Sequence, residues 1–311
     1  MGWKAVFAYL TGLLMIGLLI FYWIVPLQNI DFGQWSNNGS YNFSINSSNA
    51  TSIAMQFYPN LRYSSPDISY NIINCSLQRR GDMETAMSIL ENLTVLKFYP
   101  VSSNEQISIA CDYSAQIAEG QPGFFVAGEG GPTNITESGM FNVINHGSVL
   151  LLKDSSCPEP NVAIHELLHA LGFNHSKNPN NVMYPVSSCY QTIGQDIPDL
   201  INQLYSYPSL PDLAFENVSA AMNGPSLNMN FTVRNEGLVP SPGAEVDVYA
   251  NNKSVYTVQF NHLGIGEGRR IFVTNVFLLQ KNINQLKFVI NSNFEELNKS
   301  NNEVLLNYSN S

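Results

Sequence analysis

The residues best able to do chemistry lie together in the run HELLHALGFNH, residues 165–175. On a helix, residues four apart lie on one face, about 6 Å apart along the axis, so His165 and His169 can present both imidazoles to one metal ion. Gly172 accepts a positive φ, which ends a helix and lets the chain bring His175 back as a third ligand. The spacing therefore predicts a metal site with three histidine ligands.

Three protein ligands leave one coordination position for water, which is typical of a catalytic rather than a structural zinc. Zinc lowers the pKa of its bound water toward ~7 and makes that water a nucleophile at neutral pH. Glu166 is not spaced to join the ligands, and we expect it to accept the proton of that water. The alternative, a core helix with incidental histidines, is disfavoured because the pattern continues with a glycine and a third histidine at fixed spacing.

The run resembles the H-E-x-x-H-x-x-G-x-x-H signature of metzincin zinc peptidases, with Met183 of the following VMYP run as the Met-turn. Within that clan, Ser176 and the Met-Tyr-Pro run look most like matrixins. The resemblance implies an α+β catalytic domain with a twisted mixed sheet, a zinc helix, a Met-turn and a closing helix. We expect the Met183 thioether to form an apolar floor beneath the ligands. The resemblance further implies a pocket for the substrate side chain after the cut bond, lined by Tyr184, Pro185 and Val186.

The sequence also departs from patterns known in related families. Astacins and serralysins carry a zinc-facing tyrosine two residues beyond the methionine, and Pro185 occupies that position here. Animal matrixins often use a propeptide cysteine for latency, but no cysteine precedes Cys75, so a cysteine switch is not expected. Their second zinc and calcium sites need extra ligands, and His146, the spare upstream histidine, is interpreted as a core or solvent residue. We expect one catalytic Zn²⁺, and nothing in the sequence supports Ca²⁺.

The elements that must position this site are expected within a peptidase domain at residues 53–208. Alternating apolar residues predict the strands, and an apolar stripe at helical spacing predicts a helix with Asp82 as its N-cap. The zinc helix should begin near Asn161, and the closing helix should have Asp196 as its cap. The predicted strands are 69–75, 97–101, 107–113 and 148–153, with a glycine-rich loop at 128–132. The resemblance to matrixins implies that an edge strand that holds the substrate follows this loop, anywhere between 133 and 145.

From residue 209 to 311 the pattern changes to short alternating runs with turn residues between them, which predicts an Ig-like β-sandwich. The PDLA run at 211–214, FTVRNEG at 231–237 and the ending at 298–304 resemble the cell-adhesion-related (CARDB) domains of prokaryotic surface proteins. This fold is compatible with binding to a cell-surface polymer or protein. It is equally compatible with a passive spacer role. The predicted strands are 213–218, 227–235, 244–249, 254–260, 270–277, 286–290 and 304–308.

The N-terminal residues 1–26 contain an apolar run at 5–25, long enough to cross a ~30 Å hydrocarbon core as a helix. With Lys4 before this run, the positive-inside rule predicts a cytoplasmic N-terminus and an extracellular catalytic domain. A cleaved secretory signal is the alternative, and the protein would then be secreted. The Asn- and Ser-rich residues 27–52 are interpreted as a stalk, and the frequent Asn-x-Ser/Thr triplets predict a glycoprotein.

The four cysteines, an even number in a domain expected to be exported, favour two disulfides. Three connectivities exist for four cysteines. Cys157 precedes the zinc helix and Cys189 follows the Met-turn, so a bond between them would tie the turn to the helix. Cys75 and Cys111, near two predicted strands, would then pair with each other.

Net charge and composition exclude one class of partner. The chain has a formal net charge of −10, with 12% charged residues and no basic run, so nucleic-acid binding is not expected. We therefore expect a zinc-dependent endopeptidase, with Glu166 as general base and acid, that cleaves extracellular or cell-surface proteins. The alternative is a surface adhesion protein whose metalloprotease-like domain does not catalyse, and the intact Glu166 disfavours it.

Overall fold

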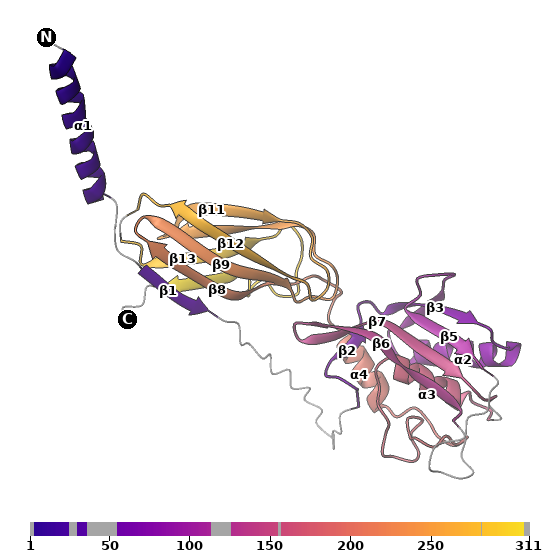
Figure 1. Ribbon diagram of the computed structural model, residues 1–311. Helices are drawn as coiled ribbons and strands as arrows, with labels where there is room; N and C mark the ends of the chain where they lie inside the picture. Colours follow the sequence, from indigo (N-terminus) through magenta and orange to yellow (C-terminus); the bar gives the residue numbers. More distant parts are fainter. Residues whose placement is uncertain are drawn as a thin grey trace. The chain divides into compact units, whose positions relative to one another are not determined.

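The computed structural model describes residues 3–24, 30–35, 55–112, 126–154, 157–280 and 282–307 (Figure 1). The chain divides into two compact units. The histidine unit comprises residues 40–210 and 237–239, and the sandwich unit comprises residues 1–39, 211–236 and 240–311. The boundary between the two units after residue 210 lies close to the predicted domain boundary at 208/209.

The histidine unit is built on one twisted mixed sheet with the strand order β2-β7-β5-β3-β4, in which neighbouring strands are parallel. Strand β6 is the exception, because it runs antiparallel to β7 along the whole length of β7. Among the described residues no other strand pairs with β6, so β6 is an edge strand. The strands are β2 (Leu61–Tyr63), β3 (Asp67–Ile73), β4 (Lys97–Pro100), β5 (Ile107–Cys111), β6 (Gly128–Ser138) and β7 (Phe141–Leu151).

Two helices that contact each other, α2 (Leu77–Leu93) and α3 (Asn161–Ala170), cover one face of this sheet (Figure 1). Their apolar side chains, together with those of the strands, form one continuous buried core. Helix α4 (Asp196–Leu204) closes the unit and contributes Ile197 and Ile201 to the same core. The mixed sheet and the three helices agree with the predicted α+β class, and α3 begins at Asn161 as predicted.

Several predicted boundaries in this unit need correction. Strand β2 was not predicted, because its three residues are too few to form a pattern. The N-cap of α2 is Ser76 rather than Asp82, and the Ser76 hydroxyl accepts a hydrogen bond from the Arg79 amide. The first turn was missed because Arg79 looks solvent-exposed in the sequence. It is buried, with its guanidinium donating to Asp154 and to three backbone carbonyls.

The cap of α2 gives a testable stability change. Replacing Ser76 with Ala should lower the free energy of unfolding by about 1 kcal/mol, because the Arg79 amide loses its acceptor at the helix terminus. Ser88→Ala, at an exposed position of the same helix, is the matched control and should leave stability nearly unchanged. Urea unfolding of the two variants measures the difference, and equal midpoints would show that the cap bond contributes nothing.

The predicted glycine-rich loop at 128–132 is wrong, because these residues form the first half of strand β6. Glycines usually mark loops, but here their missing side chains allow a close approach of the strand to a helix, as described below. The edge strand expected between 133 and 145 therefore begins earlier, at Gly128, and ends at Ser138. A turn through Gly139 (φ 56°) leads into β7, whose last residues include part of the strand predicted at 148–153.

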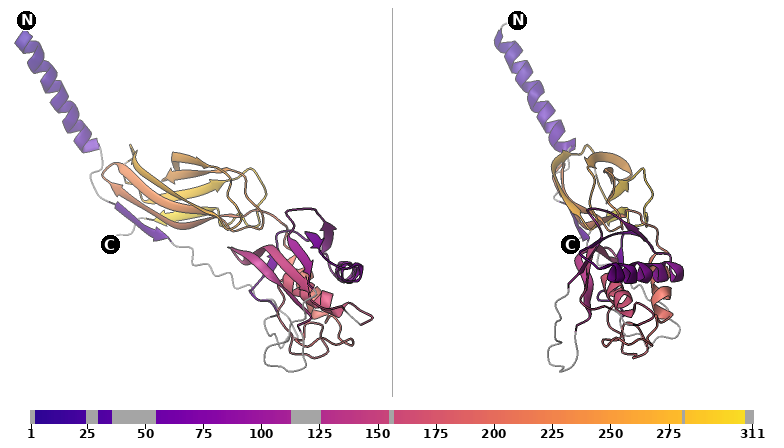
Figure 2. Two further views of the ribbon diagram at one scale, coloured as in Figure 1. Left: turned by 45° about the vertical axis from the view of Figure 1, so that its right-hand side comes forward. Right: turned by 90° about the vertical axis from the view of Figure 1, so that its right-hand side faces the viewer.

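The sandwich unit consists of two four-stranded sheets with the orders β1-β8-β9-β12 and β11-β10-β13-β14 (Figure 2). All seven predicted strands are present. Phe215, Phe231 and Phe288 from both sheets meet edge to face in the core, with ring centroids 5.5 to 6.2 Å apart. The strands are β8 (Leu213–Asn223), β9 (Ser226–Asn235), β10 (Ala244–Ala250), β11 (Lys253–Phe260), β12 (Gly268–Phe277), β13 (Gln285–Asn291) and β14 (Glu303–Asn307).

The eighth strand, β1 (Ile30–Trp35), comes from the segment predicted as a stalk and pairs antiparallel with β8. The stalk interpretation of residues 27–52 is therefore wrong at 30–35, where the run IDFGQW adds a strand at the edge of the sheet beside β8. The rest of the predicted stalk lies outside the described residues. Helix α1 (Trp3–Ile24) precedes this strand. The transmembrane helix predicted over 5–25 is not borne out, because no helix among the described residues is long and apolar enough to cross a bilayer.

Both predicted disulfides are present in the structure. Cys75, just after β3, is bonded to Cys111 at the end of β5, and Cys157 is bonded to Cys189. The second bond joins the segment before α3 to the segment after Met183. No free cysteine remains among the described residues.

Candidate metal centre

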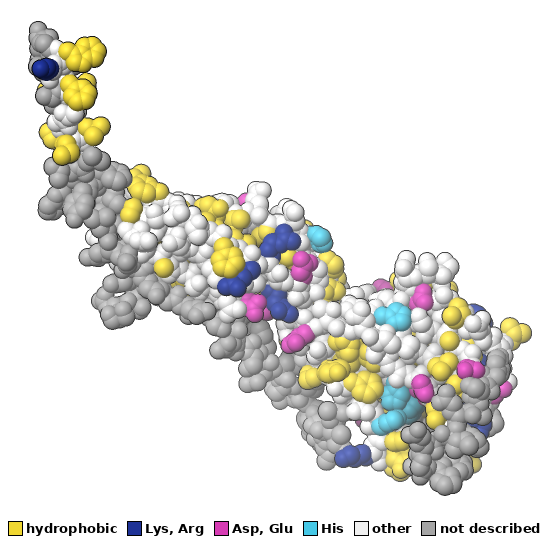
Figure 3. Space-filling model, viewed as in Figure 1, with side chains coloured by type: hydrophobic (Ala, Val, Ile, Leu, Met, Phe, Trp, Pro, Cys, Tyr) yellow, Lys and Arg dark blue, Asp and Glu magenta, His cyan; other side chains and the backbone are white. Residues whose placement is uncertain are grey.

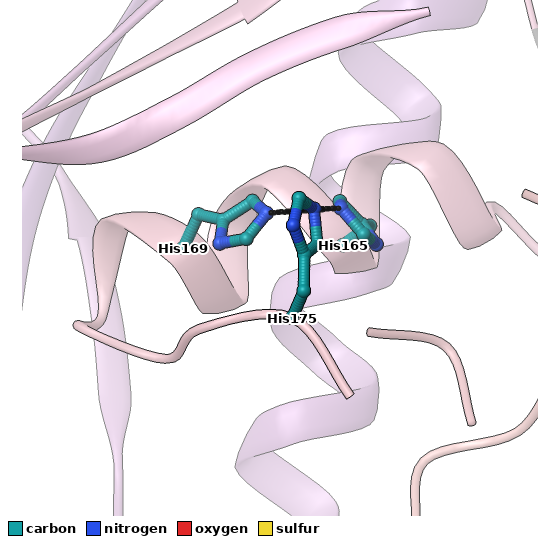
Figure 4. A group of neighbouring side chains, drawn as sticks. All are labelled: His165, His169 and His175. Carbon is teal, nitrogen blue, oxygen red and sulfur yellow. Dashed lines mark hydrogen bonds between the residues drawn. The ribbon is translucent and has the colours of Figure 1, made fainter. Parts of the chain in front are cut away.

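Helix α3 and the turn after it bring three imidazoles together (Figure 4). The His165 and His169 side chains lie one helical turn apart on one face of α3, and His175 reaches the same point from the chain that follows. Their Nε2 atoms are 2.9 Å apart for His165 and His169, 3.3 Å for His165 and His175, and 3.2 Å for His169 and His175. Among the described His, Cys, Asp and Glu side chains, these three form the one group close enough to share a metal ion.

Gly172 produces the turn that returns the chain to the site. With φ at +98°, it closes α3 through two backbone bonds, from the Gly172 amide to the His169 carbonyl and from the Phe173 amide to the Leu168 carbonyl. A side chain at Gly172 would also collide with Leu61. The turn aims the Phe173 carbonyl at His169 Nδ1, 2.7 Å away, and this bond orients the second imidazole.

The Met-turn orients the first imidazole through its backbone. His165 Nδ1 donates to the Val182 carbonyl at 2.7 Å. The Met183 amide, on the residue after Val182, donates to the Asn181 side-chain oxygen at 2.8 Å. Met183 is 1% exposed and belongs to the domain core, and its role as a floor beneath the ligands stays a prediction. The disulfide Cys157–Cys189 joins the segments on either side of this arrangement.

The geometry and chemistry of the three imidazoles fit a zinc ion. Nitrogen ligands at 2.0 to 2.1 Å in a tetrahedral arrangement are separated by roughly 3.3 Å, close to the distances observed. Because Nδ1 of both His165 and His169 donates to a carbonyl, the neutral rings carry a bare lone pair on Nε2. Two such lone pairs facing each other repel unless a cation lies between them. Burial lowers the pKa of all three histidines, that of His169 to about 4, which favours the uncharged rings at neutral pH.

Glu166, next to the first ligand, is 6% exposed. Burial, and to a lesser extent the charge of Glu129, raises the pKa of the Glu166 carboxyl to about 8. The carboxyl does not belong to the group that could share the metal ion, and its role as a proton acceptor stays a prediction. A divalent cation nearby favours the charged carboxylate and so opposes the effect of burial.

Two glycines of β6 allow the edge strand to pack directly against α3 at Glu166. A Cβ atom on Gly130 would lie 2.2 Å from the Glu166 backbone oxygen, and one on Gly128 would lie 2.7 Å from Glu166 Cγ. Residues two apart on a strand face the same side, so Gly128 and Gly130 together present a surface without side chains to α3. Sequence reasoning missed this contact because it interpreted the glycines as a loop.

This contact gives a second prediction. Gly130→Ala should lower the free energy of unfolding by about 1 to 3 kcal/mol or more, because the atom it meets is backbone and cannot move aside. Gly131→Ala, with nothing within 4 Å of its added methyl, should leave stability unchanged or slightly raised. Comparison of urea midpoints checks the pair. Equal loss in both variants would mean that contact with α3 does not explain the glycine at position 130.

A cavity of about 560 Å³ lies beside β6 and is lined by Phe57, Tyr58 and four residues of β6. Phe57 also stacks on His169, with ring centroids 5.7 Å apart, so the cavity lies next to the metal centre. Histidine side chains gather beside apolar ones on the face of the histidine unit seen in Figure 3. The β6 residues that line the cavity are Gly131, Pro132, Thr133 and Ile135.

The predicted pocket residues lie elsewhere than this cavity. Tyr184 is half-buried, and Pro185 and Val186 are exposed, on the chain just after Met183. None of the three lines the cavity beside β6, and their role at the substrate side chain stays a prediction. His146 has hydroxyl partners on both ring nitrogens, Ser108 and Thr133.

Two family models match the sequence. The model described as matrixin matches residues 28–206, which is more than half of the chain, and the CARDB model matches residues 210–305. No curated protein matches. Among solved structures, a crystal structure of a Pyrococcus furiosus CARDB domain in complex with di-metal ions is 21% identical, with a TM-score of 0.27, over 32% of this chain and 88% of that one. The solution structure of that domain has the same sequence identity and TM-score, and the match covers 32% of this chain and 94% of that one.

Proposed function

Because this chain belongs to the matrixin family, we propose that it is a zinc-dependent endopeptidase that cleaves extracellular or cell-surface proteins. Family membership supports the general class of zinc metallopeptidase. One observation carries the rest of the proposal, namely three imidazole Nε2 atoms 2.9 to 3.3 Å apart, with the buried carboxyl of Glu166 on the residue next to the first histidine. A domain that only bound its targets would have no need of that carboxyl.

The chain's own residues would divide the reaction as follows. His165, His169 and His175 would hold the zinc ion, which supplies Lewis acidity and an activated water when it is bound. Glu166 would accept a proton from the attacking water and pass it to the nitrogen of the leaving amine. The free edge of β6 offers backbone donors and acceptors to which an extended peptide could pair, as in other strand-addition complexes.

We further propose that the protein works outside the cytoplasm. Both disulfides support this location, because such bonds persist in oxidising compartments. The CARDB match supports an adhesion-like part, and the sandwich unit would then hold the enzyme near a cell-surface polymer or protein. Fractionation of cells that express the tagged chain tests the location, and recovery from the cytoplasm with reduced cysteines would contradict it.

Cleavage of a peptide library, followed by mass spectrometry, tests the activity. We expect internal cuts by the purified chain, loss of cutting after zinc chelation, and recovery when zinc is added back. Identical cuts before and after chelation would point to a contaminating protease. A zinc-loaded chain that makes no cut in a diverse library would favour the rival function of a non-catalytic surface binding protein.

A further inference from the structure

The sandwich unit contains a second oxygen-rich cluster that peptidase chemistry does not use. It is made of Asp212, just before β8, and Glu296, Asn301 and Asn302 in the connection between β13 and β14. We call these four residues the oxygen cluster. Asn301 Nδ2 donates to Asp212 Oδ1 at 3.1 Å, and Asn302 Nδ2 donates to Glu296 Oε1 at 2.9 Å. Glu296 also accepts from the Leu213 amide at 2.7 Å, which joins the two segments.

One carboxylate in this cluster, that of Asp212, is removed from water, whereas Glu296 is only partly buried. Asp212 is 8% exposed. Burial raises the pKa of Asp212 to about 7, and the nearby charges of Glu296 and Glu236 contribute to the increase. None of the ion pairs among the described residues includes Asp212 or Glu296. Buried carboxylates are normally paired or coordinate a metal ion, and Asp212 has no cationic partner among the described ion pairs.

The two amides supply an independent reason. Asn302 is 6% exposed, and the Oδ1 atoms of both Asn301 and Asn302 are buried without any hydrogen-bond partner. In the observed orientation, each Nδ2 faces a carboxylate and each oxygen lacks a donor. If either amide is turned by half a rotation, its oxygen faces that carboxylate instead, which is repulsive when the carboxylate is ionised. A cation placed between them would remove this conflict, because it attracts the amide oxygen and the carboxylate alike.

We propose that the oxygen cluster binds a hard divalent cation of the calcium type, held by the carboxylates of Asp212 and Glu296 and the carboxamide oxygens of Asn301 and Asn302. The ligand set contains only oxygen, which favours calcium or magnesium over zinc or copper. The ligands lie on an irregular connection rather than on rigid strands, and calcium tolerates such variable geometry better than magnesium. The bound ion would fix the β13–β14 connection to the start of β8.

Isothermal titration of CaCl₂ into the full chain, in calcium-free buffer, tests the proposal. We expect saturable binding of about one ion, with a dissociation constant on the order of 10⁻⁴ to 10⁻³ M, as in extracellular modules. Asp212→Asn and Glu296→Gln should each weaken binding at least ~10-fold, because each removes a charged ligand. Glu295→Gln, at the exposed neighbouring position, should bind as the unaltered chain does. Absence of binding to the unaltered chain, or binding that survives both cluster variants, would overturn the proposal.

A gain-of-binding variant covers the case in which the two loss variants unfold. Asn302→Asp adds a charged oxygen ligand at the same position and should bind calcium at least ~3-fold more tightly. Equal or weaker binding by a folded Asn302→Asp chain would contradict the site. If the unaltered chain shows no heat of calcium binding at all, a buried water that donates to the two amide oxygens replaces the cation as the explanation.

Discussion

Glu166→Ala should retain about one zinc per chain yet lose peptidase activity by at least ~10², because the ligands remain while the group that accepts the water's proton is gone. The change is expected in kcat rather than in substrate affinity, since a proton acceptor acts mainly in the transition state. Steady-state kinetics on one peptide from the library, with zinc measured in the same samples, gives both quantities.

Glu129→Gln is the matched control for this experiment. It removes the exposed carboxylate whose charge acts on Glu166 but leaves Glu166 in place. Its activity should stay within a few-fold of that of the unaltered chain. If Glu166→Ala remains as active as the unaltered chain, the proposed role of Glu166 is wrong. If Glu166→Ala instead loses its zinc, the carboxyl serves the fold of the site rather than proton transfer.

Removal of either disulfide should lower the free energy of unfolding by roughly 3 to 4 kcal/mol in the chain-entropy model. The bonds span 36 residues for Cys75–Cys111 and 32 residues for Cys157–Cys189, so their effects on stability should be similar. Their effects on zinc should differ, because only Cys157–Cys189 joins the segment before α3 to the segment after the Met-turn, whose Val182 carbonyl orients His165.

The double variants Cys157→Ser with Cys189→Ser, and Cys75→Ser with Cys111→Ser, test this difference without leaving a free thiol. After competition with a chromogenic chelator at a temperature where both remain folded, the first should release zinc faster than the second. Equal release would mean that hydrogen bonds hold the Met-turn without the disulfide. The Asn161 side chain makes two such bonds, because it donates to the Ser188 and Gln191 carbonyls.

The parts of the site that local spacing determines could be predicted from the sequence. Two histidines one helical turn apart, a glycine and a third histidine specify their own geometry, and the structure brings all three together. The Phe173 and Val182 carbonyls could not be predicted, since every residue carries a carbonyl and only the fold aims it. Phe57, which stacks on His169, comes from a segment more than a hundred residues away and leaves no local pattern.

The fold was predictable to a similar degree and for a similar reason. Alternating apolar residues gave all seven strands of the sandwich, because each strand buries one face. The failures occur where contacts distant in sequence override local composition. Arg79 lies in a helix turn that looks polar, Gly128 and Gly130 lie in a strand that looks like a loop, and β1 pairs with a strand about 180 residues later.

Extended X-ray absorption at the zinc edge of the purified, active chain tests the central claim most directly. We predict about one zinc per chain, with three imidazole nitrogens and one further oxygen at roughly 2.0 to 2.1 Å. Replacement of His175 by Ala should reduce the imidazole count to two while the first disulfide, Cys75–Cys111, stays intact. Zinc bound by sulfur, or an unchanged imidazole count in the His175 variant, would contradict a catalytic zinc held by these three histidines.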